Sequence, residues 1–239
     1  MTTNWNIIVT FNKDYYKNNK QDKDRLGLLF YSNIIKNYFT PKNFLDYGCG
    51  TGFLLKKVSR INSINKTYGF EVNNYARIQA KKNSSKSLII NNLRKIKENS
   101  IDIITCLHVI EHVKDNELKK IFLLFKHILK SEGLIMLATP AKNGLGHKIK
   151  KKKWIGYRDK THINMKNFNE WKIFFYKNNF KIIKSSSDGL WDFPYNMKKN
   201  KFLILKVIIT MIFQIFTGKL FLKYSEGESF IFLLKYQNN

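Results

Sequence analysis

The chain has 239 residues, of which 44% are hydrophobic and 15% aromatic, so it is long enough for one α/β domain with a buried core. Only two cysteines occur, Cys49 in a glycine-rich turn and Cys106 in an apolar run, which argues against a disulfide framework and favours a reducing compartment. The first residues lack a basic stretch followed by a long apolar run, so we expect no signal peptide and a cytoplasmic protein.

The charge is strongly positive, with 43 Lys and Arg against 17 Asp and Glu and a formal net charge of +26. Such a charge favours an anionic partner, either nucleic acid or an anionic membrane surface. The lysines are nevertheless spread along the whole chain, and its wealth of Lys, Asn, Ile and Phe is equally typical of a bias in composition.

The first part of the chain predicts an arm and a covering helix. Residues 1–24 are polar, and we expect them to be loosely ordered. From Arg25 the apolar residues recur at helical spacing and stop before Thr40-Pro41, which predicts a helix laid over the ligand side of the domain. We therefore expect an N-terminal arm and helix over 1–40 and the main domain over 41–239.

From residue 43 onward, strands alternate with amphipathic helices, which is typical of βαβ units, a mostly parallel sheet and helices on both of its faces. The expected strands are 43–47, 67–71, 87–90, 101–107, 133–139, 180–185 and 229–235. The expected helices are about 52–61, 74–82, 115–129 and 165–178.

An apolar helical insertion is expected at about 198–223, before the last strand. Within Phe202–Phe221 the polar residues Lys206, Thr210 and Gln214 are four apart, which predicts a narrow polar stripe against a wide apolar face. These polar residues disfavour a membrane span. Two interpretations remain: an interfacial membrane helix with basic flanks, or a lid packed on the domain. The flanking lysines are Lys198, Lys199, Lys201, Lys219 and Lys223.

The most distinctive stretch is Asn43–Leu55, NFLDYGCGTGFLL, which predicts a strand, a tight turn with glycines at 48, 50 and 52, and a helix. Glycines remove Cβ atoms from the turn, so backbone N–H groups can approach a nucleotide-like ligand. The pattern G-x-G-x-G differs from the G-x-G-x-x-G of dinucleotide-binding folds. A glycine turn without a ligand is the alternative.

The run Asp46–Gly52, DYGCGTG, resembles motif I of the class I S-adenosylmethionine (SAM) dependent methyltransferases. The similarity extends over about residues 40–185 and is to the small-molecule, ubiquinone-type O-methyltransferases. It implies SAM as cofactor and a Rossmann-like, doubly wound, seven-stranded sheet with an antiparallel last strand.

Residues at the ends of the expected strands fit a SAM site. Glu71 follows the glycine turn by about 20 residues, where an acidic side chain accepts hydrogen bonds from ribose hydroxyls. The resemblance places an asparagine at the adenine, Asn91 or preferably Asn92, and it implies that Asp46 orients the turn and the methionine amino group. The expected cofactor-binding residues are Asp46, Gly48, Cys49, Gly50, Gly52, Glu71, Asn92, Cys106 and Leu107.

The string His108-x-x-Glu111-His112 matches the H-x-x-E-H zinc motif but follows a strand instead of lying on a helix, so we do not expect zinc proteolysis. The ubiquinone-type enzymes carry a Glu-x-x-Glu-His pattern that has been proposed to hold a divalent ion. This chain has His108 in place of the first Glu, and we assign no metal.

Two histidines are candidate general bases. His162 lies in Asp159-Lys-Thr-His162, a segment that faces the substrate pocket in the resembling group, and His162 or His112 would take the acceptor's proton. For His162, a structural role in pinning its loop is the alternative. Tyr157 and Arg158 are nearby candidates for binding an anionic substrate.

We therefore predict an enzyme that moves the methyl group of SAM in line to a small-molecule or lipid-linked acceptor, at oxygen, and that lies peripherally on the inner face of a membrane. An RNA methyltransferase is an alternative, but nucleic acid is less favoured because an aromatic and basic RNA platform is missing. A SAM-fold membrane-peripheral scaffold without catalysis is the other alternative.

Overall fold

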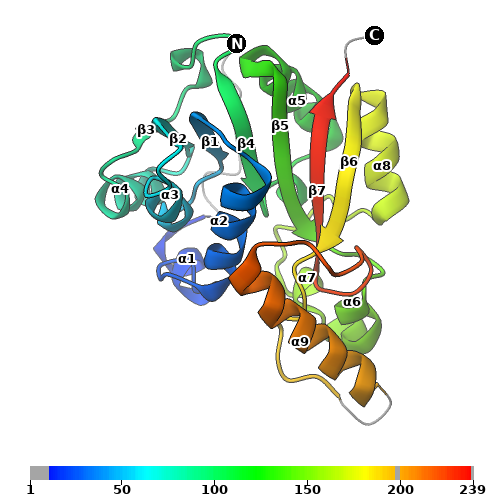
Figure 1. The fold of residues 1–239 in the computed structure, drawn as a ribbon. Helices are drawn as coiled ribbons and strands as arrows, with labels where there is room; N and C mark the ends of the chain where they lie inside the picture. Colours follow the sequence, from blue (N-terminus) through cyan, green and yellow to red (C-terminus); the bar gives the residue numbers. More distant parts are fainter. Residues whose placement is uncertain (1–10, 197–199, 238–239) are drawn as a thin grey trace.

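The computed structural model describes residues 11–196 and 200–237. Its centre is a seven-stranded sheet in the order β3-β2-β1-β4-β5-β7-β6 (Figure 1). β7 runs antiparallel to both of its neighbours, and the other neighbouring strands are parallel. The strands are β1 (Asn43–Tyr47), β2 (Lys66–Phe70), β3 (Leu88–Ile90), β4 (Ile101–Leu107), β5 (Leu129–Pro140), β6 (Phe180–Ser187) and β7 (Ser229–Tyr236). The predicted doubly wound, Rossmann-like fold with an antiparallel last strand is confirmed.

Helices cover both faces of this sheet (Figure 1). The α-helices are α1 (Lys13–Asn18), α2 (Leu26–Tyr38), α3 (Phe53–Val58), α4 (Asn74–Asn83), α5 (Asp115–Ile128), α6 (Leu145–Lys150), α7 (Ile155–Arg158), α8 (Phe168–Lys177) and α9 (Lys201–Thr217). Short 3₁₀ helices are η1 (Leu93–Lys95), η2 (Ile110–His112) and η3 (Lys151–Lys153).

The core has two parts because successive side chains of a strand point to opposite faces. In β7, Phe230 and Phe232 belong to one cluster with aromatic residues of α5 and α8. Ile231 and Leu233 belong to the other, with apolar residues of α2, α3 and α9. The sheet is thus buried on both sides, as expected for a mostly parallel sheet.

The register brings three strand ends together at one edge of the sheet. Tyr47, the last residue of β1, lies opposite Phe70, the last residue of β2, and Asp46 lies opposite Thr105 of β4. The glycine turn, the residue after β2 and the segment after β4 therefore share this edge.

The expectation of a loose N-terminal arm is wrong for residues 11–24, and residues 1–10 lie outside the described part of the chain. Asn12 caps α1 by accepting a hydrogen bond from Tyr15 N at 2.9 Å, and Tyr16 is buried. The side chain–backbone contact of Thr51 Oγ1 with Gln21 O ties the segment to the glycine turn. A helix, α2, lies where the covering helix was expected.

α9 packs on the domain through one stripe of residues and leaves the opposite stripe exposed. Gln214 does not share an exposed polar stripe with Lys206 as predicted, because it is fully buried and bonded to the backbone. Lys198 and Lys199 lie outside the described residues. Among the helices described, none combines the length and apolar content needed to cross a bilayer.

Candidate active site

A cavity with a volume of about 440 Å³ lies at the edge of the sheet where β1, β2 and β4 end. This size is typical of small-molecule and cofactor sites. Its lining combines the glycine turn, the residues after β2 and β4, parts of α1 and α2, and the segments that follow β6 and precede β7.

The glycine turn forms one wall. Gly48, Gly50 and Gly52 have φ values of +75°, +53° and +83°, which other residues adopt only with strain. A Cβ at Gly48 would lie 2.5 Å from Val109 Cγ2, and a Cβ at Gly52 would lie 2.8 Å from Ala80 Cα. The backbone N–H groups of Gly48 and Cys49 donate to Phe70 O at 2.8 and 3.0 Å, which ties the turn to β2.

Glu71 joins the turn to the second strand. Its Oε2 accepts from Gly50 N at 2.9 Å and its Oε1 accepts from Asn73 N at 2.8 Å. The side chain is buried at the cavity wall, and this burial raises its pKa above the ordinary value. The carboxyl group therefore has a fixed position beside the turn and lone pairs left for a ligand.

Asp46 is the second carboxyl group on this side. It accepts a hydrogen bond from Thr105 Oγ1 at 2.7 Å and lines the cavity. Burial raises the pKa of Asp46 to about 7, with a further increase from the charge of Glu71 and a partial offset from the Thr105 hydrogen bond.

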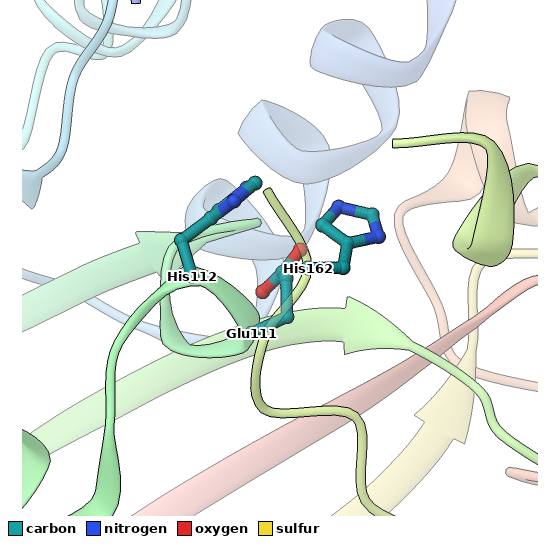
Figure 2. A group of neighbouring side chains, drawn as sticks. All are labelled: Glu111, His112 and His162. Atoms are coloured by element: carbon teal, nitrogen blue, oxygen red, sulfur yellow. The ribbon is translucent and has the colours of Figure 1, made fainter. Parts of the chain in front are cut away.

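On the other side of the cavity, Glu111, His112 and His162 converge (Figure 2). One ligand atom from each lies within 4.8 Å of the other two. η2 supplies Glu111 and His112, and the segment after α7 supplies His162. Residues fifty positions apart in the chain thus meet as one group.

Glu111 is fully buried, and its histidine neighbours favour its ionised form. Burial opposes its charge, yet His108, His112 and His162 outweigh that effect and lower its pKa below the ordinary value. Its Oε2 accepts from Thr139 Oγ1 at 3.1 Å, and its Oε1 has no hydrogen-bond partner among the described residues. A buried oxygen without a partner is costly unless a ligand completes it.

The hydrogen bonds of the two imidazoles fix their tautomers. His162 Nδ1 lies 2.7 Å from Gly156 O, and His112 Nδ1 lies 3.2 Å from Thr161 O. Carbonyl oxygens only accept, so Nδ1 is the donor in both rings, and the lone pair of a neutral ring is then on Nε2. His162 Nε2 lies 3.8 Å from Asp159 Oδ2. Burial lowers the pKa of His112, although Glu111 opposes the shift, so this ring favours the neutral form.

One carboxylate and two imidazoles make a donor set that divalent metal ions prefer. No metal was expected here from the sequence, whereas the structure brings together residues that fit one. His108, which replaces the first Glu of the related pattern, lies beside this group, with Nδ1 3.4 Å from Glu111 Oε1.

Further cavity residues were not predicted from the sequence. Tyr15 donates from its hydroxyl to Asp159 Oδ2 at 3.1 Å, so α1 contacts the loop that carries His162. Asp188 and Glu228 also line the cavity, and burial raises their pKa values to about 6 and about 7. The proximity of Asp188 to the end of the expected strand 180–185 is the one sequence signal that could have found it.

Five predicted site residues are not among those that line the cavity. Gly52 is one of them, and its φ of +83° serves the turn into α3. Asn92 is exposed and its side chain accepts from Arg94 N at 3.0 Å, so it caps η1 and gives its predicted adenine contact no geometric support. Cys106 is fully buried in the core. Tyr157 packs on Trp154, and Arg158 forms an ion pair with Asp192. The other predicted residues that line the cavity are Asp46, Gly48, Cys49, Gly50, Glu71, Leu107, His112 and His162.

Solved structures with the same fold include a SAM-dependent methyltransferase from Clostridium acetobutylicum, with 14% identity, coverage of 98% of this chain and 100% of that chain, and a TM-score of 0.60. A SAM-dependent methyltransferase from Archaeoglobus fulgidus has 15% identity, coverage of 92% and 99%, and a TM-score of 0.59. A TehB-like SAM-dependent methyltransferase from Corynebacterium glutamicum has 12% identity, coverage of 95% and 100%, and a TM-score of 0.58. At these identities the likeness is one of fold.

Comparison with curated protein sequences gave no significant match. A family model described as a methyltransferase domain, in contrast, matches residues 19–185, well over half of the chain and the whole of the glycine turn, Glu71 and the histidine pair. The chain therefore belongs to the methyltransferase domain family, as an enzyme with SAM as its cofactor.

Proposed function

We propose that this enzyme transfers the methyl group of SAM to an oxygen atom of a small, lipid-like acceptor that binds beside His112 and His162. One observation carries the proposal: the glycine turn and Glu71 line the same cavity as the two histidines. SAM at the glycine turn and an acceptor hydroxyl at the histidines would therefore bind next to each other.

The cofactor side fits SAM through charge and shape. Glu71 accepts hydrogen bonds from the ribose hydroxyls, and the turn at Gly48 and Gly50 lets the backbone approach the ligand. Asp46 in its ionised form attracts the cationic methionine end. SAM supplies a methyl group that its sulfonium makes reactive, so the protein's main contribution is alignment and exclusion of water.

On the acceptor side, His112 removes the proton. Nδ1–H of His112 is held by Thr161, whose Oγ1 lies 2.8 Å away, so Nε2 is the atom that accepts the proton from the acceptor hydroxyl. The ionised Glu111 stabilises the imidazolium that results. His162 has the same tautomer and lies with its ring centroid 4.7 Å from that of His112.

Glu111, His112 and His162 would be able to hold a divalent cation, since their donors converge and Glu111 Oε1 has no hydrogen-bond partner among the described residues, only His108 Nδ1 at 3.4 Å. Such a cation would polarise the acceptor oxygen and lower the pKa of its hydroxyl, and this would replace proton removal by His112, because the single lone pair on Nε2 cannot serve both roles. An imidazole must be neutral both to bind a cation and to accept a proton.

We place the activity in a reducing compartment, at the inner face of a membrane. Cys49 and Cys106 are both buried free thiols, which supports such a compartment. The membrane location follows from the proposed acceptor, because a lipid-like molecule would itself lie in a membrane.

The test is methyl transfer from methyl-labelled SAM to a panel of acceptors: a prenylated catechol, a polyprenyl-linked sugar and total RNA. We expect an O-methyl product from a lipid-like acceptor, and a loss of about 10²–10⁴-fold in its rate for His112→Gln with SAM affinity unchanged. Label in RNA, or a His112→Gln rate equal to wild type, would contradict the proposal. Calorimetry with Mn²⁺ on wild type and Glu111→Gln separately tests the cation.

A further inference from the structure

α9 has two apolar faces, and only one is used by the fold. Its buried residues are Ile204, Val207, Met211, Gln214 and Ile215, which pack in the core cluster shared with α2 and β7 or bond to the backbone of the domain. On the opposite side, Phe202, Phe213 and Phe216 are 87%, 62% and 71% exposed.

The exposed residues form one continuous stripe. At about 100° per residue, the positions of Phe202, Leu205, Ile209, Ile212, Phe213 and Phe216 fall within a sector of about 100°, opposite the buried stripe. We call these six residues the outer face of α9. Contiguous apolar surface of this kind marks an interaction site, because a solvent-facing stripe is otherwise polar.

Positive charge surrounds the outer face. Lys201 begins α9, Lys206 lies at the edge of the stripe, and Lys219 and Lys223 follow the helix, all four exposed. Lys206 contacts Glu226 only at 3.7 Å, with its side chain 68% exposed. The helix itself carries neither Asp nor Glu.

A second group of lysines lies at the same end of the molecule. η3 consists of the exposed Lys151, Lys152 and Lys153, and it directly follows α6. α6 packs against the same core cluster as α9 through Leu145 and Ile149, and both helices lie beyond the β5 and β7 strand ends in Figure 1.

We infer that the outer face of α9 docks in the plane of an anionic lipid bilayer. The phenylalanines and isoleucines enter the boundary between headgroups and acyl chains, and the lysines remain with the anionic headgroups. A bilayer is the occupant that accepts an apolar stripe and its flanking lysines together.

The cavity is joined to this surface by a short segment. β6 leads through Asp188 and Trp191, which line the cavity, towards α9, and a Cβ at Gly189 would lie 2.5 Å from Met211 Cγ. Docking of α9 therefore holds the part of the cavity lining formed by Asp188 and Trp191 near the bilayer, where a lipid-like acceptor would be reached. The connection between docking and a lipid-like acceptor rests on the proposed function. Docking itself does not, because it requires no methyl transfer.

Flotation of the full chain with vesicles of phosphatidylcholine, with and without phosphatidylglycerol, tests the inference. We expect wild type to float with the anionic vesicles and the double variant Phe202→Ser/Phe216→Ser to bind them at least about tenfold more weakly. The control Ile173→Ser/Tyr176→Ser changes two residues of α8 that are 54% and 76% exposed, and should bind as wild type does. Because headgroup attraction is electrostatic, Lys151→Gln/Lys152→Gln/Lys153→Gln should also weaken binding, as should added salt.

SAM affinity, measured on the same preparations, should not differ between these variants, which separates docking from the cofactor site. Wild type that stays unbound, or equal binding by the Phe202→Ser/Phe216→Ser variant, would overturn the inference. Sedimentation velocity without lipid tests the alternative that a second copy of the chain binds the outer face. If wild type is a dimer and the Phe202→Ser/Phe216→Ser variant is a monomer, the outer face is a dimer interface and the inference is overturned.

Discussion

Carboxyl groups with opposite shifts in pKa share the cavity. Burial raises the pKa of Asp46 to about 7 and that of Glu228 to about 7, whereas the surrounding histidines lower the pKa of the equally buried Glu111. Buried carboxyl groups whose pKa values differ in this way take different roles. Here Asp46 attracts the cationic SAM, and Glu111 keeps a negative charge beside the acceptor.

The raised pKa of Asp46 predicts pH-dependent SAM affinity. The pKa rises from 3.8 to about 7 on folding, so the free enzyme holds a proton on Asp46 below pH 7. The cationic SAM favours the ionised carboxylate, so binding must release that proton, and affinity should fall about tenfold for each pH unit below 7 and level off above it. Calorimetric titration with SAM between pH 5.5 and about 8.5 checks this.

Asp46→Asn is the control for the pH effect. It keeps the acceptor for Thr105 Oγ1 and removes the ionisation, so its SAM affinity should be weaker at pH 8 and nearly constant across the range. If the SAM affinity of the variant fell with pH as steeply as that of wild type, the proton released on binding would come from another group. Glu71 would be the first candidate, because its pKa is also raised.

At the level of elements, the turn between β1 and α3 depends on Gly52. Gly52→Ala places a Cβ at φ +83° and 2.8 Å from Ala80 Cα on α4, so we expect the free energy of unfolding to drop by about 2–5 kcal/mol. Urea unfolding of Gly27→Ala is the matched control, because Gly27 lies in a helix with its nearest neighbour 4.0 Å from the added Cβ. That variant should gain up to about 1 kcal/mol, and an equal loss in both would refute the argument from the turn.

The buried amide of Gln214 holds α9 to the domain. Its Nε2 donates to Ser187 O at 3.1 Å, and its Oε1 accepts from Phe221 N and Leu222 N at 2.7 and 2.8 Å. Gln214→Leu leaves these backbone groups without partners and should lower the free energy of unfolding by about 2–5 kcal/mol in a urea titration. Thr210→Val removes only a bond within the helix and should stay within about 0.5 kcal/mol of wild type, so similar losses would contradict this role.

Elements with a strong local pattern were predicted well from the sequence. β1, β4 and α2 follow from short-range apolar spacing and a Pro boundary, and the structure places them within a few residues of the expected bounds. α1 was missed because its stability comes from tertiary contacts, the burial of Tyr16 and the bond of Tyr15 to Asp159, instead of from an apolar repeat.

At the scale of the whole molecule, the site could be predicted only where topology alone fixes positions. A parallel sheet brings the ends of β1, β2 and β4 to one edge, so Asp46, Glu71 and His112 were found. Asp188 and Glu228 come from segments around β6 and β7 whose paths depend on packing with α9, and their spacing in the chain carries no pattern. Tyr157 and Arg158 were candidates for substrate binding, but the structure places them outside the cavity lining.

The most direct test of the account is a calorimetric titration of the purified chain with SAM and with S-adenosylhomocysteine, wild type beside Glu71→Ala. We predict that wild type binds both ligands and that the variant loses about 10–100-fold in affinity, since a charge-assisted hydrogen bond to the ribose contributes about 1.5–3 kcal/mol. Circular dichroism of both proteins shows that they are folded. A folded wild type that binds neither ligand would contradict the SAM-dependent activity, and a variant with wild-type affinity would contradict the cofactor site built around Glu71.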